Sequence, residues 1–291
     1  MVKKILLFGA NGLLGTELYE TLKCTHSIIR LNKNEADITN FSHIESIILR
    51  ENPDIIINAA AFMNADKCEQ NPSLTYQINT VAAKNIALLS NKINAKYVWF
   101  SSDFVFDGNS NRPYNELDIP NPIMTYGVSK YAAEKEIINS CNDYLLIRTS
   151  TLFSEYSSSF LDNMLKRIEN KEVLSIVDDI IMSPCYGKTL VESLLQLIEK
   201  QAPNGIYHIV NEGEVSWYDF FAEFLNLIAI DYPLNRISYS NLNFQENMIK
   251  RPAYTAMSIS KTESIIGKIP FWKDDLKKFV LNKYNLSHGG I

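Results

Sequence analysis

Short apolar runs alternate with longer amphipathic segments through the first half of the chain. Apolar runs of four to five residues predict buried strands at 5–8, 27–31, 54–58, 97–101 and 144–148. Segments with helical periodicity lie between them at 12–22, 41–50, 74–92 and 126–140. Strands that alternate with helices in this way are typical of an α/β fold with a doubly wound parallel sheet of the Rossmann type.

The second half is less regular. Helices are predicted at 160–170, 187–200 and 216–227, a strand at 205–210, and a loose tail at 287–291. We therefore expect residues 1–150 to form a dinucleotide-binding domain that carries the catalytic residues. Residues 151–291 are expected to form mostly a smaller substrate-binding lobe, with some segments returning to the first domain.

Composition and charge bear on the partners, the location and the metal or disulfide content expected of the protein. The 291 residues carry a net charge of −5 without a dense basic block, which argues against nucleic acid as a partner. The apolar run at 5–8 is too short for a signal peptide or a membrane span, so we expect a cytoplasmic protein that does not bind a membrane. Four scattered cysteines and the absence of a carboxylate cluster with ligand spacing predict neither zinc, disulfides nor another metal.

A glycine-rich turn follows the first predicted strand. Its sequence, Gly9-Ala-Asn-Gly12-Leu-Leu-Gly15, leads directly into the first predicted helix. Glycines at this spacing permit a tight turn and a close approach of the backbone to a pyrophosphate, which the positive end of the helix attracts. The turn predicts a dinucleotide site that includes Asn11, Leu13 and Leu14.

The end of the second predicted strand bears on the choice of cofactor. The acidic residue that usually binds a ribose 2′-hydroxyl is missing there, and Arg30-Leu-Asn-Lys33 stands in its place. Either cation can pair with a 2′-phosphate, which favours NADPH slightly over NADH. A solvated surface charge is the alternative for both.

A tyrosine and a lysine four residues apart form a candidate proton-transfer pair. On a helix the two side chains share a face, and an ammonium would favour the phenolate and bring the tyrosine pKa toward neutrality. The spacing occurs three times, at Tyr19/Lys23, Tyr126/Lys130 and Tyr131/Lys135, where about one chance match is expected from composition. Position selects Tyr126/Lys130, because Tyr126 opens a helix and Ser102 ends a strand at the carboxyl edge of the sheet.

Four motifs in this order resemble the extended short-chain dehydrogenase/reductase family, and within it the dTDP-4-dehydrorhamnose reductase group. They are the glycine turn, Asn58-Ala-Ala-Ala61, Ser101-Ser-Asp-Phe-Val-Phe-Asp-Gly108 and Tyr126-Gly-Val-Ser-Lys130. The resemblance covers nearly the whole chain. It implies a reductase in which Ser102 hydrogen-bonds a substrate carbonyl, Tyr126 donates the proton, and Lys130 binds the nicotinamide ribose and adjusts the tyrosine pKa.

The resemblance also implies further contacts to cofactor and substrate. Asp37 and Ile38 match the segment that meets the adenine, and Ala59, Ala60 and Ala61 leave room beside the ribose. Asn79 either supports the active-site backbone or is a buried structural amide. The residues implied at the substrate are Ser102, Asp103, Phe104, Tyr126, Thr151 and Arg251. Arg251 either meets a diphosphate or sugar, or forms a structural ion pair.

The chain departs from the reductase pattern where the sugar is recognised. Thr151 stands where the group usually has tryptophan, and Ile180, Met182 and Cys185 replace glutamine, glycine and threonine. Loss of an aromatic wall and of polar groups is expected to alter sugar recognition. The 4,6-dehydratase pattern is also absent, because Asp103 is followed by Phe104 and not by glutamate.

Three functional hypotheses remain open on the sequence. The first is an NAD(P)H-dependent reductase of a nucleotide-diphospho-4-keto-6-deoxy sugar in surface polysaccharide synthesis. The second is a non-catalytic subunit that binds the dinucleotide without turnover, and the third is an epimerase that retains NAD. Intact Ser102, Tyr126 and Lys130 favour the reductase. The resemblance also allows a homodimer.

Overall fold

A six-stranded parallel sheet forms the centre of the protein. The computed structural model describes residues 2–239 and 249–284. The sheet has the order β10-β5-β4-β3-β1-β2, and all neighbouring strands are parallel. Its strands are β1 (Lys4–Phe8), β2 (Ser27–Leu31), β3 (Ile55–Asn58), β4 (Lys96–Ser102), β5 (Tyr144–Thr149) and β10 (Gly205–His208). The α/β prediction is confirmed, and the strand predicted at 205–210 completes one edge.

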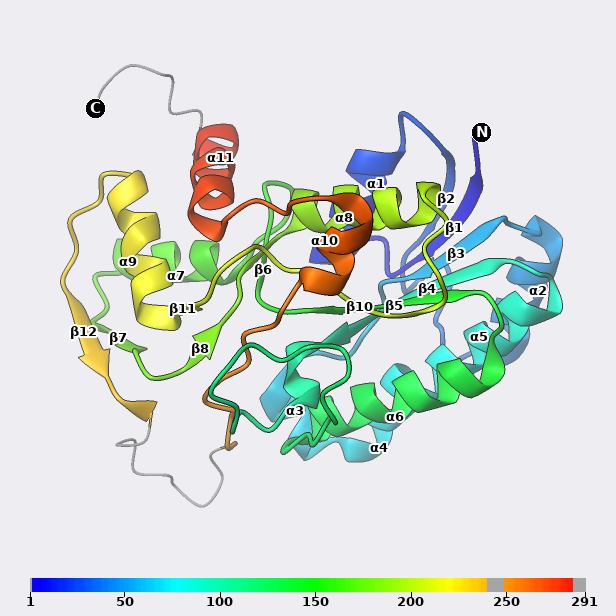
Figure 1. Cartoon of the computed structure of the whole chain (residues 1–291), viewed down its shortest axis with the longest axis horizontal. Helices are drawn as coiled ribbons and strands as arrows, with labels where there is room; N and C mark the ends of the chain where they lie inside the picture. Colours follow the sequence, from blue (N-terminus) through cyan, green and yellow to red (C-terminus); the bar gives the residue numbers. More distant parts are fainter. Residues whose placement is uncertain (1, 240–248, 285–291) are drawn as a thin grey trace.

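Helices cover both faces of the sheet (Figure 1). On one face lie α1 (Leu13–Leu22) and α8 (Gly187–Glu199); on the other lie α2 (Phe41–Glu51), α5 (Ala83–Lys92) and α6 (Thr125–Ser140). The strands are apolar on both sides, as a sheet between two helical layers requires. Leu7 faces the α1/α8 layer and its neighbour Leu6 faces the α2/α5 layer, so alternate residues of one strand serve two cores.

The strand order places the ligand crevice. The chain runs from β1 outward to β2 and then crosses back to β3 on the other side of β1. Connections leave in opposite directions at this point, which opens a crevice beyond the carboxyl ends of β1 and β3. The glycine turn follows β1 and the segment after Asn58 follows β3, so both flank the crevice.

The helix predicted at 74–92 is interrupted by a wider turn. The structure has α4 (Pro72–Tyr76), a π-helical segment η1 (Gln77–Ala82) and then α5. Short π-helical segments often occur at functional sites, and this one holds Asn79, which is fully buried. The preceding short helix α3 (Ala65–Gln70), which the pattern did not predict, is capped by Asn64 through the Lys67 amide.

Several segments of the second half pack around a separate aromatic core, and we call this part the smaller lobe. Phe153, Phe220, Phe221, Phe224 and Phe279 are buried together. The lobe's helices are α7 (Phe160–Glu169), α9 (Trp217–Leu227) and α11 (Trp272–Tyr284), and its short strands are β6 (Leu152–Phe153), β7 (Leu174–Val177), β8 (Ile181–Met182), β9 (Cys185–Tyr186), β11 (Val215–Ser216) and β12 (Leu234–Ile237). The helices predicted at 160–170, 187–200 and 216–227 are confirmed to within one residue at each end.

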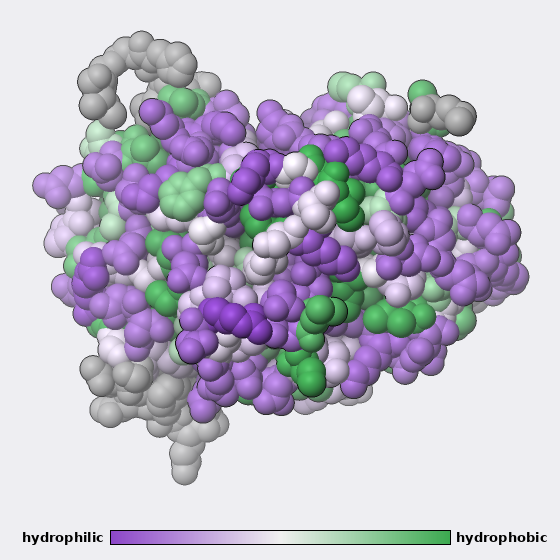
Figure 2. Space-filling view, in the orientation of Figure 1, coloured by the Kyte–Doolittle hydropathy of each residue, from purple (hydrophilic) through white to green (hydrophobic). Residues whose placement is uncertain are grey.

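Several elements of this half had no sequence signal. Two-residue strands such as β8 are too short for an alternating pattern, and α10 (Ser260–Ile266) and α11 were not predicted. The tail expected at 287–291 lies outside the described residues. Figure 2 shows a largely hydrophilic face with small scattered apolar patches. Over the residues that the structure describes, every helix is too short or too polar to cross a membrane.

Candidate active site

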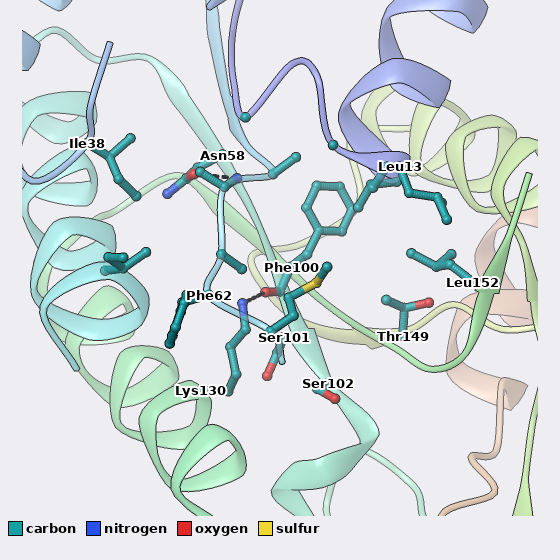
Figure 3. Close-up of a pocket in the computed structure, with 18 of the residues that line it drawn as sticks. Leu13, Ile38, Asn58, Phe62, Phe100, Ser101, Ser102, Lys130, Thr149 and Leu152 are labelled. Atoms are coloured by element: carbon teal, nitrogen blue, oxygen red, sulfur yellow. Dashed lines mark hydrogen bonds between the residues drawn. The ribbon is translucent and has the colours of Figure 1, made fainter. Parts of the chain in front are cut away.

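A cavity of about 550 Å³ lies at the carboxyl ends of β1, β3 and β4 (Figure 3). Many residues that the sequence nominated line it: Gly9, Asn11, Gly12, Leu13, Leu14, Asp37, Ile38, Ala59, Ala60, Ala61, Ser102, Tyr126 and Lys130. Lys33, which the sequence offers as a partner for a 2′-phosphate, lines it as well. Further lining residues were not nominated from the sequence: Phe62, Met63, Ile78, Phe100, Ser101, Thr149, Ser150 and Leu152. Ser101 belongs to one of the four motifs, whereas the tertiary structure was needed to place the other residues of this list at the cavity.

Two glycines of the turn are required by the packing of the fold, because a side chain there would collide with neighbouring backbone. Gly9 has a φ of +76°, and a Cβ there would lie 2.5 Å from the Ala60 nitrogen. A Cβ on Gly15, which is buried and does not line the cavity, would lie 2.1 Å from the Gly9 oxygen. These contacts bring β1, α1 and the segment after β3 together.

Gly12 differs from them, because the protein leaves room for a side chain. Its Cβ would approach the Gly9 oxygen only to 3.4 Å, an ordinary contact, yet Gly12 faces the cavity. Helix α1 begins one residue later, and no side chain caps its first turn. An uncapped helix N-terminus beside an open backbone turn fits the pyrophosphate of a dinucleotide.

Lys130 is buried beneath the cavity and held by the strand beside it. Its Nζ donates a hydrogen bond of 2.8 Å to the Phe100 carbonyl, and it lies 4.3 Å from the centre of the Trp99 ring. Burial lowers the pKa of Lys130 to about 7, although the charge of Glu134 opposes the shift. The ammonium is thus fixed in position and titrates near neutral pH.

Tyr126 is also buried, with Ser102 beside it. Burial and the Asp103 charge raise the pKa of Tyr126, and a hydrogen bond with Ser102 opposes the rise. The spacing of Tyr126 and Lys130 in the sequence predicts that Lys130 lowers this pKa. In the structure the opposite shift prevails, because desolvation outweighs the nearby amine, which is 5.8 Å from the Tyr126 ring centre and itself destabilised as a cation.

The other two tyrosine–lysine pairs are elsewhere. Tyr131 contacts its own Lys135 at 4.2 Å through a cation–π interaction. Tyr19 lies on α1 under the Arg30 guanidinium, 4.3 Å away. None of these side chains lines the cavity.

Asn79 supports the backbone beside the cavity. Its Oδ1 accepts from the Phe62 amide at 2.8 Å, and its Nδ2 donates to the Phe62 carbonyl at 3.0 Å and to Ser129 Oγ at 3.0 Å. The amide therefore ties the segment after β3 to helix α6, which carries Tyr126 and Lys130. Asn79 itself does not line the cavity.

Three charged residues near the cavity differ in whether they line it and in their hydrogen-bond partners. Asp37 lines the cavity, and its Oδ1 accepts from the Thr39 amide and hydroxyl, which lowers the Asp37 pKa. Arg30 does not line the cavity but donates to Asn11 Oδ1 at 3.1 Å, and Asn11 does line it. Lys33 lines the cavity directly.

The residues nominated for the substrate lie in three places: Ser102 and Tyr126 line the cavity, three others lie outside it, and Arg251 lines a second cavity. Asp103 is 5% exposed, and its carboxylate accepts hydrogen bonds from protein hydroxyls. Phe104 packs edge-on against Tyr126 at 6.2 Å, and Thr151 accepts from the Cys185 amide through its carbonyl. None of these three lines the cavity, while Arg251 lines a second one.

The second cavity, of about 350 Å³, lies mainly in the smaller lobe. Its apolar walls include Phe160, Ile180 and Trp217, and its cations are Arg167 and Arg251. Among the described residues, Asp66 from α3 is the one lining residue that comes from the first half of the chain. Arg251 and Ile180 were named from the sequence in connection with the substrate. The full set was not predicted, because its residues come from separate segments that meet only in the folded chain.

Known proteins are similar to this chain over nearly its whole length. The RmlD substrate binding domain family matches residues 3–285. The spore coat polysaccharide biosynthesis protein SpsK of Bacillus subtilis is 34% identical over 95% of this chain and 96% of its own length. The dTDP-4-dehydrorhamnose reductase of Aggregatibacter actinomycetemcomitans is 32% identical over 94% and 97%.

Solved structures show the same relationship. The dTDP-4-dehydrorhamnose reductase of Bacillus anthracis, solved in complex with NADP, superposes with a TM-score of 0.91 at 31% identity. The match covers 97% of this chain and 100% of that one. The chain therefore belongs to the RmlD substrate binding domain family, within the extended short-chain dehydrogenases/reductases.

Proposed function

We propose that this protein is an NADPH-dependent reductase of a 4-keto-6-deoxy sugar carried on a nucleoside diphosphate, with dTDP-4-dehydrorhamnose as the first candidate. One observation carries the proposal: Ser102, Tyr126 and Lys130 meet in the same cavity as the glycine turn. A proton donor and a dinucleotide turn in one cavity are what carbonyl reduction needs.

The residues of the chain would divide the work as follows. The first turn of α1 and Gly12 hold the pyrophosphate, Ile38 and Asp37 lie at the adenine end, and Lys130 holds the nicotinamide ribose. Bound NADPH supplies the hydride. Tyr126 gives its phenolic proton to the carbonyl oxygen as that oxygen becomes negative, so no free alkoxide accumulates.

The second cavity is suited to the nucleotide part of the substrate. Trp217 and Phe160, whose rings are 4.5 Å apart, provide apolar surface for a base, and Arg167 and Arg251 provide charge for a diphosphate. Ile180, which stands where the group has glutamine, makes this wall apolar. For Arg251 a contact to the diphosphate is better supported than a structural ion pair. None of the ion pairs found among the described residues includes Arg251.

The test is a panel of nucleotide-linked 4-keto-6-deoxy sugars, incubated with NADPH or NADH while absorbance at the nicotinamide band is followed. We expect NADPH oxidation with at least one sugar, and a product whose new hydroxyl has a single configuration. Tyr126→Phe should abolish most of the rate. If no sugar consumes cofactor while NADPH still binds, the proposal is wrong and a non-catalytic subunit is indicated. Cofactor that remains bound through purification and returns to its starting state after turnover would indicate the epimerase.

A further inference from the structure

Helix α6, which carries Tyr126 and Lys130, has no N-terminal cap of its own. Its N-cap residue is Met124, whose side chain makes no hydrogen bond to the first turn, and no acidic residue lies in that turn. The first amides of a helix lack partners within the helix, and an apolar N-cap residue is among the least favourable choices. A partner for this turn therefore has to come from outside α6.

Glu69, on the short helix α3, supplies that partner. Its two carboxylate oxygens accept from the two donors of Thr125, the first residue of α6. Oε1 accepts from the backbone amide at 2.6 Å, and Oε2 accepts from the hydroxyl at 2.5 Å. A carboxylate at this end of a helix also interacts favourably with the positive end of the helix dipole. One side chain from another helix thus replaces the missing cap.

The capping carboxylate is presented from a fixed position. Cys68, the residue before Glu69, is fully buried, and its thiol donates to the Phe62 carbonyl at 3.3 Å. Phe62 lines the cavity of Tyr126 and Lys130, and α3 packs directly against α6. Helix α3 is therefore anchored beside the active site before it reaches α6.

The capped turn contains the proton donor. Tyr126 directly follows Thr125 and lies in the first turn of α6. Lys130 lies one turn further on and is tied to β4 through the Phe100 carbonyl. Helix ends fray more readily than helix interiors. Loss of the cap would therefore displace Tyr126 and leave Lys130 in place.

The opposite side of the same turn is packed closely against the chain after β4. A Cβ at Gly127 would lie 2.0 Å from the Phe104 oxygen, so the two backbones are in direct contact there. The first turn of α6 is thus held by backbone packing on one side and by Glu69 on the other. Without Glu69 only the packing contact would remain.

We propose that Glu69 is a positioning residue that holds Tyr126 at the substrate carbonyl by capping the first turn of α6. The inference rests on the proposed function, in which Tyr126 gives its proton to a sugar carbonyl. Glu69 lines neither cavity, so it acts through Tyr126 and not by contact with cofactor or substrate. Asp66, on the same six-residue helix, lines the second cavity. Helix α3 therefore joins the cavity suited to the nucleotide to the turn that carries the proton donor.

The kinetic test is a double-mutant cycle between Glu69→Ala and Tyr126→Phe, with whichever 4-keto sugar nucleotide the unmodified protein reduces. We expect Glu69→Ala to lower kcat by about 10- to 100-fold, because the proton donor is misplaced. The KM for the sugar and the Kd for NADPH should change by less than about threefold, because Glu69 touches neither. In the Tyr126→Phe background the same change should have almost no further effect on kcat, because the group that Glu69 positions is gone.

Milder variants keep the test decisive if Glu69→Ala does not fold. Glu69→Gln keeps one acceptor oxygen and loses the charge, and Thr125→Val removes only the hydroxyl donor. Each should lower kcat by about two- to tenfold. The two together should lose less than the product of the single losses, because both break the same hydrogen bond. Thr125→Ser, which retains the hydroxyl, should keep the full kcat.

Asn40→Ala is the matched control for the loss of a helix cap. Asn40 caps α2 by accepting from the His43 amide at 3.3 Å, and none of the described residues that line the two cavities comes from α2. We expect this variant to lower the urea midpoint of unfolding and to leave kcat unchanged. A cap that only stabilises the fold would behave in this way.

Fluorine NMR of protein labelled with fluorotyrosine reads the surroundings of Tyr126 without any turnover. The Tyr126 resonance is the one that disappears in Tyr126→Phe. With NADPH bound, we expect it to shift or broaden in Glu69→Ala and to stay unchanged in Asn40→Ala. The resonance of Tyr131, which lies further along α6, should stay unchanged in both variants.

The outcomes separate the two proposals. If the unmodified protein reduces no sugar, the proposed function fails, and the Tyr126 resonance alone decides whether Glu69 positions this tyrosine. An unchanged Tyr126 resonance in Glu69→Ala would overturn the inference, as would an unchanged kcat. Equal losses of kcat with and without the Tyr126 hydroxyl would also overturn it, because Glu69 would then act on the fold as a whole.

Discussion

Arg148 and Glu134 form a two-pronged ion pair that is completely buried between β5 and α6. Nε donates to Oε1 at 2.9 Å and a terminal nitrogen donates to Oε2 at 2.8 Å, with both side chains 1% exposed. His208 lies 3.4 Å from the same guanidinium, and burial and the Arg148 charge lower the His208 pKa to about 3, which keeps it neutral. The pair fixes the helix that carries Tyr126 and Lys130.

Removing one partner of this pair should destabilise the protein strongly. Glu134→Gln leaves the Arg148 charge buried without a counter-charge, so we expect the free energy of unfolding to fall by about 3–5 kcal/mol. Urea unfolding followed by circular dichroism measures it. Glu136→Gln is the control on the same helix, because its partner Lys84 is exposed and such pairs contribute about 0–1 kcal/mol. Equal effects at the two positions would contradict the prediction.

Substitution of the tyrosine should affect activity differently in the three tyrosine–lysine pairs, although all three share one spacing. We expect Tyr126→Phe to lower kcat by about 10²- to 10⁴-fold, because it removes the proton donor and leaves the ring in place. Tyr131→Phe and Tyr19→Phe should retain nearly full activity. Initial rates with NADPH, together with thermal unfolding to show that all three variants fold, check this. Loss of activity in Tyr131→Phe would weaken the assignment of Tyr126.

Glu17 should make stability depend on pH. It lies fully buried on α1, accepts from Ser154 Oγ at 2.5 Å, and burial raises its pKa to about 7. The folded state holds this proton between the unfolded pKa of about 4.5 and about 7, so its stabilising contribution is complete below 4.5 and is lost as pH rises through 7.

Glu17→Gln tests this directly, since glutamine keeps the shape and cannot ionise. We expect the stability of the variant relative to the unmodified protein to rise between pH 5 and pH 8 by roughly 1–3 kcal/mol. Chemical unfolding at a series of pH values measures the difference. Glu20→Gln is the matched control, because Glu20 lies on the same helix but is partly exposed beside Lys23. A constant difference across the range for Glu17→Gln would argue against the shifted pKa.

Cofactor preference should depend on the cations after β2. If a 2′-phosphate binds at this end of the cavity, Lys33→Ala and Arg30→Ala should each raise the KM for NADPH by about 3- to 30-fold and leave the KM for NADH unchanged. Lys33 should have the larger effect, because it lines the cavity and Arg30 reaches it only through Asn11. Steady-state kinetics with both cofactors measures this. Equal losses with NADPH and NADH would remove the argument for a phosphate contact.

The second cavity should control affinity for the nucleotide part of the substrate. We expect Trp217→Ala to raise the KM for the sugar nucleotide by about tenfold or more, because it removes the largest apolar wall. The Kd for NADPH should stay the same, since the two cavities share no residue. Tyr218→Ala, the next residue on α9 but absent from the cavity lining, is the control. A change confined to NADPH affinity would show that the cavity has another role.

Much of the first half could be predicted because its signals are local. The β1 run and the glycine turn after it depend on residues adjacent in sequence, and buried parallel strands leave continuous apolar runs. The resemblance added the positions of Ser102, Tyr126 and Lys130. The π-helical turn that buries Asn79 left no such pattern, because one extra residue per turn hardly alters helical periodicity over so short a stretch.

The sequence by itself determined the α/β class, the glycine turn and the candidate catalytic residues, since each depends on a short pattern or motif. The tertiary structure was needed to show that the Tyr126 pKa rises and that the Asp103 carboxylate accepts hydrogen bonds from protein hydroxyls. The physical reason is that desolvation and hydrogen bonding depend on what surrounds a group. Thr255, for example, donates a hydrogen bond to Asp103 although it lies 152 residues further along the chain.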